Sequence, residues 1–225
     1  MTLVFVHGSG GHAGVWRYQI EHFGDSVALT LPGRPDGDLC ESIEAAAAWT
    51  WNEITDRGIE QPVIVGHSLG GAIALQLAVD HPGELAGVVL IGSGARLRVH
   101  PAMLEALEGF VAGDEGFDAM FENTYDLVDP DLAKDLTDAR RRMGAKPFLS
   151  DLMACDRFDI IDRLGEIETP ALAIVGTDDV MTPPKYSEFL RERMPNARVE
   201  IVEGGSHLVF CEFPDQVNSA IESFL

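Results

Sequence analysis

Cysteine is scarce in the sequence. Cys40, Cys155 and Cys211 are the only three among 225 residues, and they lie far apart. An odd number of widely spaced cysteines fits neither a disulfide framework nor a zinc site. The sequence also lacks any apolar run near the ~20 residues that a membrane span needs, and its first residues show no basic segment typical of a signal peptide. We therefore expect a cytoplasmic protein with no metal site.

Basic residues are also few. Lysine and arginine number 16 against 37 aspartate and glutamate residues, which gives a net charge of −21. This balance opposes binding to nucleic acid or to an anionic membrane. The acidic residues are dispersed, as expected for a solvated surface that favours solubility. A high-salt habitat would select the same surface, and composition alone does not separate the two explanations.

Strand and helix patterns alternate along most of the chain. Its length and its hydrophobic content of 46% suit one α/β domain with an inserted subdomain. Short β-branched runs predict strands at residues 3–6, 27–31, 63–65, 88–91, 170–175 and 197–202. Helical patterns lie between them, including 43–56 behind the N-cap residue Ser42, 72–78, 184–194 and a last helix from 214. Repeated units of this kind predict parallel strands with helices on both faces.

The alternation stops between the fourth and fifth predicted strands. Residues 98–165 contain only helical patterns, so we expect a helical lid there and a core made of residues 1–97 and 166–225. Four of the seven methionines lie in this segment: Met103, Met120, Met143 and Met153. Methionine forms adaptable apolar surfaces, so these residues either fill the interior of the lid or line an apolar pocket. The basic run 140–142 is interpreted as a solvated helix face, which disfavours a large anionic substrate.

The sequence Gly66-His67-Ser68-Leu69-Gly70 lies between a predicted buried strand and a predicted helix. A tight turn at this point would expose the Ser68 hydroxyl, and the two glycines would remove side chains that collide there. The start of the helix would offer free N–H groups and a positive dipole to an oxyanion. The alternative is a solvent-facing serine in a glycine-rich turn, which the strand before it and the helix after it disfavour.

Other reactive residues also follow predicted strands. Ser9, the pair Asp178 and Asp179, and His207 each come just after a strand, and the carboxyl ends of parallel strands meet at one edge of a sheet. A serine hydroxyl needs a base, a histidine can supply it, and a carboxylate can orient the histidine. The alternative for His207 is a histidine that only packs in a glycine-rich loop.

Three further histidines lie near the same edge: His7, His12 and His67. We interpret them as loop-packing residues, because no suitably placed acid follows them. A metal site formed by these histidines is the weaker alternative.

Taken together, these motifs resemble those of the α/β-hydrolase superfamily over essentially the whole chain. Gly66–Gly70 resembles the nucleophile elbow, His7-Gly8 the oxyanion loop, 176–179 the acid loop and 205–207 the histidine loop. The resemblance implies a six-stranded, all-parallel sheet in the order 2-1-3-4-5-6, with a helical lid after strand 4. It also implies a Ser68-His207-Asp179 triad, with the backbone N–H groups of Ser9 and Leu69 as the oxyanion hole, and no cofactor. The antiparallel hairpin that often precedes the first of these strands is absent from the sequence.

These features predict a serine hydrolase that cleaves small, mostly apolar carboxylic esters, as a monomer or homodimer. A carbon–carbon bond hydrolase or a lactonase with the same triad is the alternative among enzymes, and the sequence does not separate these from a thioesterase. A ligand-binding receptor or scaffold with negligible turnover is the alternative outside enzymes.

Overall fold

The sheet has six strands, all parallel. A computed structural model describes residues 2–34 and 37–225. In it the strand order is β2-β1-β3-β4-β5-β6, and every neighbouring pair is parallel. The predicted fold class and strand order are therefore confirmed. The strands are β1 (Leu3–Val6), β2 (Ser26–Leu29), β3 (Val63–His67), β4 (Gly87–Ile91), β5 (Ala171–Gly176) and β6 (Ala197–Val202).

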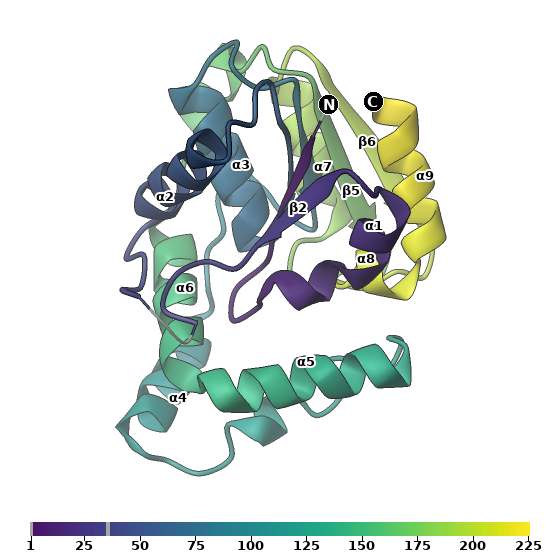
Figure 1. Cartoon of the computed structure of the whole chain (residues 1–225). Coiled ribbons are helices and arrows are strands. Elements are labelled where there is room, and N and C mark those ends of the chain that lie inside the picture. Colours follow the sequence, from purple (N-terminus) through teal and green to yellow (C-terminus); the bar gives the residue numbers. More distant parts are fainter. Residues whose placement is uncertain (1, 35–36) are drawn as a thin grey trace.

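Helices cover both faces of the sheet (Figure 1). One face is covered by α2 (Ile43–Asp56), α3 (Leu69–Asp80) and α7 (Pro184–Arg193). The other face is covered by η1 (Ala13–Trp16), α1 (Arg17–His22), α8 (Val209–Glu212) and α9 (Pro214–Phe224). The helix predicted at 43–56 begins behind Ser42, whose hydroxyl accepts a hydrogen bond from the Ala45 N–H.

Successive side chains of β1 pack into the apolar cores on opposite faces of the sheet, because side chains alternate across a strand. Leu3 and Phe5 pack in the core beside α9, whereas Val4 and Val6 pack in the core beside α2 and α3. All four are buried. This double burial explains why the strand appears in the sequence as a continuous apolar run rather than an alternating one.

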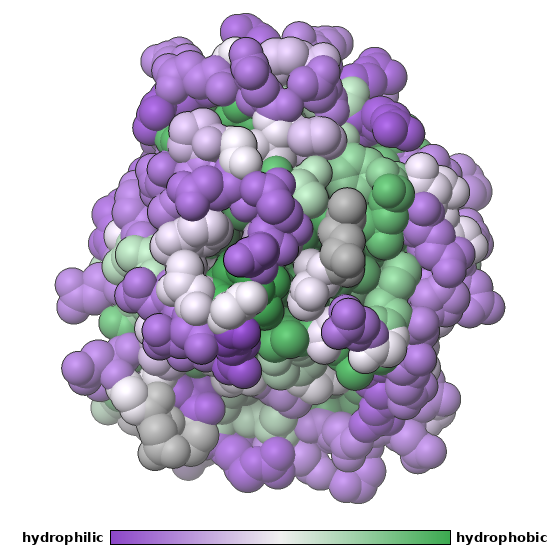
Figure 2. Space-filling view, turned by 45° about the horizontal axis from the view of Figure 1, so that its top comes forward, coloured by the Kyte–Doolittle hydropathy of each residue, from purple (hydrophilic) through white to green (hydrophobic). Residues whose placement is uncertain are grey.

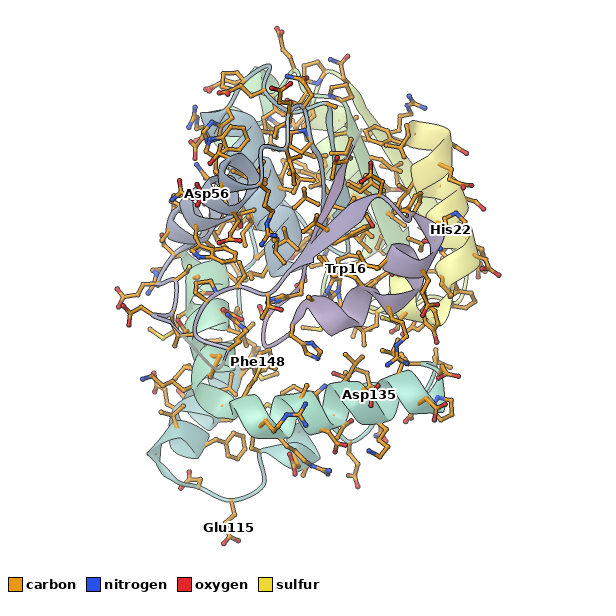
Figure 3. All side chains as sticks on the ribbon, in the orientation of Figure 1. Trp16, His22, Asp56, Glu115, Asp135 and Phe148 are labelled. Atoms are coloured by element: carbon orange, nitrogen blue, oxygen red, sulfur yellow. The ribbon has the colours of Figure 1, made fainter. Side chains whose placement is uncertain are left out.

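A helical insertion lies between β4 and β5. It contains α4 (Pro101–Ala112), η2 (Asp118–Phe121), α5 (Pro130–Met143) and α6 (Ala145–Arg157), and η3 (Ile161–Glu166) leads back to the sheet. In Figure 1 it lies below the sheet, across the ends at which the strands finish. Figure 3 shows Asp135 on the side of α5 that faces the core, where it pairs with Arg17 of α1. That residues 98–165 form a subdomain of their own stays a prediction.

The surface is largely hydrophilic. Figure 2 shows one face with hydrophilic residues around its rim and hydrophobic residues gathered toward its middle. Within the described part of the chain, no helix has both the length and the apolar character to cross a membrane.

Candidate active site

Ser68 occupies the turn between β3 and α3, and its backbone is strained. Its φ of 52° lies in the left-handed region, with ψ at −114°. Non-glycine residues rarely adopt such angles, and they cluster at functional sites. A side chain on Gly66 would collide with the backbone of Gly70, and one on Gly70 would collide with the carbonyl of Val6. Both glycines are therefore required by the close approach of the chain at this turn.

Asp179 and His207 form a hydrogen-bonded pair. The Oδ2 atom of Asp179 lies 2.8 Å from Nδ1 of His207. Its Oδ1 atom accepts the N–H groups of Met181 (2.9 Å) and Thr182 (2.8 Å), and the Thr182 hydroxyl donates to Oδ2 at 2.8 Å. Burial alone would raise the pKa of Asp179, but the bond to His207 and the bonds from Thr182 outweigh it and lower the pKa to about 2. Asp179 is therefore a carboxylate that can orient His207.

The loop that carries His207 is held on both sides. Glu212 accepts the Ser206 N–H at 2.6 Å and also bonds the Ser206 hydroxyl. Nε2–H of His67 donates to the His207 carbonyl at 2.9 Å. These contacts fix the backbone of the histidine while Asp179 fixes its ring.

Ser68 and His207 line one cavity of about 370 Å³. Ser9 lines it too, while Asp179 is buried behind His207 and Leu69 is buried at the start of α3. Asp178, the neighbouring candidate acid, is exposed at the cavity and makes no bond to His207 within the described residues. No described group hydrogen-bonds the Ser68 hydroxyl. In enzymes without substrate, the bond between nucleophile and base is often loose and tightens when substrate binds.

Two backbone N–H groups, those of Ser9 and Leu69, are the predicted oxyanion donors. In residues 2–34 and 37–225, neither the Ser9 N–H nor the Leu69 N–H donates to another protein group. A side chain on Gly8 would collide with the ring of His67 and contact Cβ of Ser68, so the first loop runs close beside the turn. Free N–H groups beside a serine hydroxyl are what stabilisation of a tetrahedral intermediate requires.

The predicted oxyanion loop is also hydrogen-bonded to the helical insertion. The Gly10 N–H donates to Asp151 of α6 at 2.8 Å, and Asp151 pairs with the buried Arg34. Sequence reasoning missed this link, because Arg34 and Asp151 are 117 residues apart and no spacing rule connects them. The bonds of Thr182 to Asp179 and of Glu212 to Ser206 are likewise visible only in the structure.

His7 and His67 are buried and uncharged. The Leu31 N–H donates to Nε2 of His7 at 3.1 Å, so Nδ1 carries the proton and donates to the Gly8 carbonyl at 2.8 Å. Burial, with the charge of Arg34 as the next cause, lowers the pKa of His7 to about 3. Burial, and then the neighbouring His207, lowers the pKa of His67 to about 3. Both therefore act as fixed hydrogen-bonding groups of the loops.

These two histidines predict a loss of stability in acid. Below about pH 6.5 the unfolded chain binds a proton at each of them, whereas the folded chain does so only near pH 3. Near pH 5 the two together should therefore lower the free energy of unfolding by roughly 2.6 kcal/mol for each pH unit of acidification, because each accounts for nearly one proton. Urea unfolding at a series of pH values measures this slope. His67→Asn should reduce the contribution of the pair by half, and an unchanged slope would show that His67 is not a buried neutral histidine.

A metal centre is not evident. In the described ranges, no three His, Cys, Asp or Glu side chains are grouped so that they could hold a metal ion.

Known proteins with this architecture include several esterases. The alpha/beta hydrolase family matches residues 3–220. A pimeloyl-[acyl-carrier protein] methyl ester esterase of Aeromonas hydrophila is 27% identical, and the alignment covers 99% of this chain and 94% of the length of that esterase. Among solved structures, a thermophilic esterase is 30% identical with a TM-score of 0.83, over 99% of this chain and 88% of its own. A lipase-esterase related protein from Clostridium acetobutylicum is 25% identical with a TM-score of 0.83, over 100% of this chain and 94% of its own.

The family match covers all six strands, the insertion and the helices on both faces of the sheet, except for the last residues of α9. The chain therefore belongs to the alpha/beta hydrolase family.

Proposed function

We propose that this chain is a serine hydrolase that cleaves small, mostly apolar carboxylic esters through an acyl-enzyme intermediate. One observation carries the proposal: His207, bonded to the buried Asp179, lines the same cavity as Ser68, whose backbone is strained. The esterase activity of relatives at about 27–30% identity supports the same class of reaction.

In the proposed reaction, Ser68 Oγ attacks the ester carbonyl while Nε2 of His207 takes the hydroxyl proton. Asp179 holds the Nδ1–H of His207 and stabilises the imidazolium that forms. The N–H groups of Ser9 and Leu69 hold the carbonyl oxygen as its negative charge develops. His207 then donates its proton to the departing alcohol, and a water molecule activated by the same histidine hydrolyses the acyl-enzyme.

The cavity lining favours an apolar substrate. Met103, Met120 and Met143, three of the four methionines of the insertion, line the cavity beside Phe121 and Phe148. Figure 3 places Phe148 between the insertion and the sheet core. Flexible thioethers and aromatic rings form an apolar surface that adapts to the shape of an acyl chain. We therefore propose that the insertion is a lid that selects the acyl group.

A pre-steady-state assay tests the function. Mixing micromolar enzyme with p-nitrophenyl butyrate should release a burst of p-nitrophenol equal to the enzyme concentration, provided that deacylation is the slower step, and Ser68→Ala should show neither burst nor turnover. A receptor or scaffold would release no product. Turnover of a carbon–carbon or lactone substrate with no turnover of any open-chain ester would contradict the ester assignment.

Substituting Met120 should change selectivity more than stability. In Met120→Ala the cavity gains space, so octanoate esters should gain over acetate esters by roughly 1–3 kcal/mol in transition-state discrimination. Met153→Ala is the matched control, because Met153 lies on α6 with 38% of its surface exposed and does not line the cavity. Measurements of kcat/KM for acetate, butyrate and octanoate esters, together with Tm, distinguish a role of Met120 in selectivity from a role in packing. Unchanged ratios with a loss of roughly 2–5 kcal/mol of stability would mean that Met120 only fills the interior of the lid.

A further inference from the structure

Arg140 departs from the expectation that residues 140–142 form a solvated helix face. Arg141 and Arg142 are exposed, but Arg140 retains only 9% of its accessible surface and lines the cavity that contains Ser68. The reason lies in helical spacing. Arg140 follows the buried Leu132 and Leu136 at intervals of four residues, so it lies on the same face of α5 as these two leucines.

The guanidinium of Arg140 is held in a defined position by two aromatic residues. Its Cζ atom lies 4.0 Å from the ring centre of Phe121 and 4.7 Å from that of Tyr125, and it donates a hydrogen bond to the Tyr125 hydroxyl. Stacked guanidinium groups of this kind keep their remaining N–H groups available for a planar acceptor. Arg140 therefore brings a positive charge to the lining of the cavity, and it also borders a hollow on the surface of the insertion.

Arg140 lacks an acidic partner. In the part of the chain that the structure describes, no carboxylate lies within 4.0 Å of its guanidinium, although the chain contains 37 acidic residues. The other buried arginine, Arg34, shows the usual arrangement, because it is paired with the buried Asp151. A buried charge without a counter-charge is costly. An anionic group of a bound ligand could supply the counter-charge that Arg140 lacks among the described residues.

Two neutral donors also line the cavity. Tyr125 accepts its bond from Arg140, and burial raises the pKa of its hydroxyl, so the hydroxyl keeps a proton that it can donate. His12 accepts the Gly14 N–H at Nδ1, which places its own proton on Nε2. That Nε2 atom is buried and has no partner among the described residues. Among the described residues of this lining, the exposed Asp178 is the only carboxylate.

We propose that Arg140 is a specificity-determining residue that binds a free carboxylate at the far end of the substrate's acyl chain. The substrate class is then the half-esters of dicarboxylic acids, with the apolar chain against the methionines and the ester carbonyl at Ser68. The substrate class rests on the proposed esterase function. A carboxylate fits better than a phosphate monoester, because a single guanidinium balances one negative charge and its parallel N–H groups match two carboxylate oxygens.

Matched pairs of substrates test this assignment. One series contains mono-p-nitrophenyl esters of succinate, glutarate, adipate and pimelate, and the other has a neutral terminal carboxamide in place of each carboxylate. At the best chain length, the native enzyme should prefer the carboxylate over the carboxamide by at least about 10-fold in kcat/KM, as expected for hydrogen bonds to a charged group. Arg140→Met should reduce this ratio to about 1 and leave the carboxamide esters within about 3-fold. Arg141→Met, one residue away and exposed, should leave the ratio unchanged.

A competing role is that Arg140 only holds Phe121 and Tyr125 together. In that case Arg140→Met would lower Tm and slow both series equally, and the carboxylate assignment would be overturned. A ratio near 1 in the native enzyme would overturn it too, and would leave the esterase proposal intact.

Binding to an inactive variant separates the two proposals. Glutarate and adipate should raise the Tm of Ser68→Ala, and they should have no effect on Ser68→Ala combined with Arg140→Met. If this shift occurs and no ester is cleaved by the native enzyme, the carboxylate site stands and the esterase proposal fails. If esters are cleaved and no dicarboxylate raises Tm, the carboxylate site fails.

Discussion

Replacing Ser68 with alanine is expected to lower kcat for an activated ester by roughly 10⁵–10⁶-fold. The reason is that the hydroxyl is the proposed nucleophile, and among the described serines that line the cavity only Ser68 has a positive φ. The Ser9 hydroxyl is directed to the sulfur of Cys155 at 3.7 Å, and burial raises the pKa of Cys155 to about 12. The residual rate would come from the oxyanion donors and from substrate binding.

The same variant should fold as well as the native chain. Alanine keeps the Cβ atom, so the backbone strain at the φ of 52° is unchanged, and no described hydrogen bond involves the hydroxyl. Ser68→Gly is the informative companion. It should be equally inactive, and it should be more stable by about 1 kcal/mol or more, because glycine adopts positive φ without strain. Turnover by a folded Ser68→Ala variant would exclude Ser68 as the nucleophile.

Replacing Asp179 with asparagine is expected to lower kcat by roughly 10⁴-fold. The Asp179 carboxylate accepts the Nδ1–H of His207 at 2.8 Å, which leaves Nε2 free to take the proton of Ser68. An asparagine amide can donate to Nδ1 instead, and the histidine would then carry its proton on Nε2 and could not act as the base. Asparagine still offers an oxygen to the N–H groups of Met181 and Thr182, so the loop should stay in place.

Asp178→Asn is the matched control for this prediction. Asp178 is the adjacent residue, it is exposed, and its carboxylate accepts a described hydrogen bond from the hydroxyl of Thr177 at 3.2 Å. Its substitution should change kcat by less than about 3-fold, as for a surface residue outside the reacting groups. A large loss in Asp178→Asn with a small loss in Asp179→Asn would mean that Asp179 does not orient the base.

Much of the fold could be predicted because strands that are buried on both faces have a recognisable sequence pattern. A strand covered on both faces needs apolar residues along its length, and β1, β5 and the first three residues of β3 are continuous apolar runs of this kind. The Ser68 turn was also predictable, because glycines are needed wherever two backbone segments approach closely. The order of the strands came from the resemblance to a known family and not from the composition or spacing of residues.

The contacts of the insertion could not be predicted in the same way. Arg140 shares the spacing of Leu132 and Leu136, but its charge favoured an interpretation as a surface residue, and only the structure shows Phe121 and Tyr125 around it. The bond from Gly10 to Asp151 joins segments 141 residues apart. Such contacts depend on how the insertion packs on the core, and no local pattern encodes that packing.

The most direct test of the central claim is to trap the acyl-enzyme. The protein is mixed with p-nitrophenyl butyrate, quenched with acid within milliseconds and measured by intact-protein mass spectrometry, followed by peptide mapping. The account predicts one butyryl group per chain, located on Ser68, and no adduct on Ser68→Ala. Turnover of the ester with no adduct, or with an adduct at a residue other than Ser68, would contradict it.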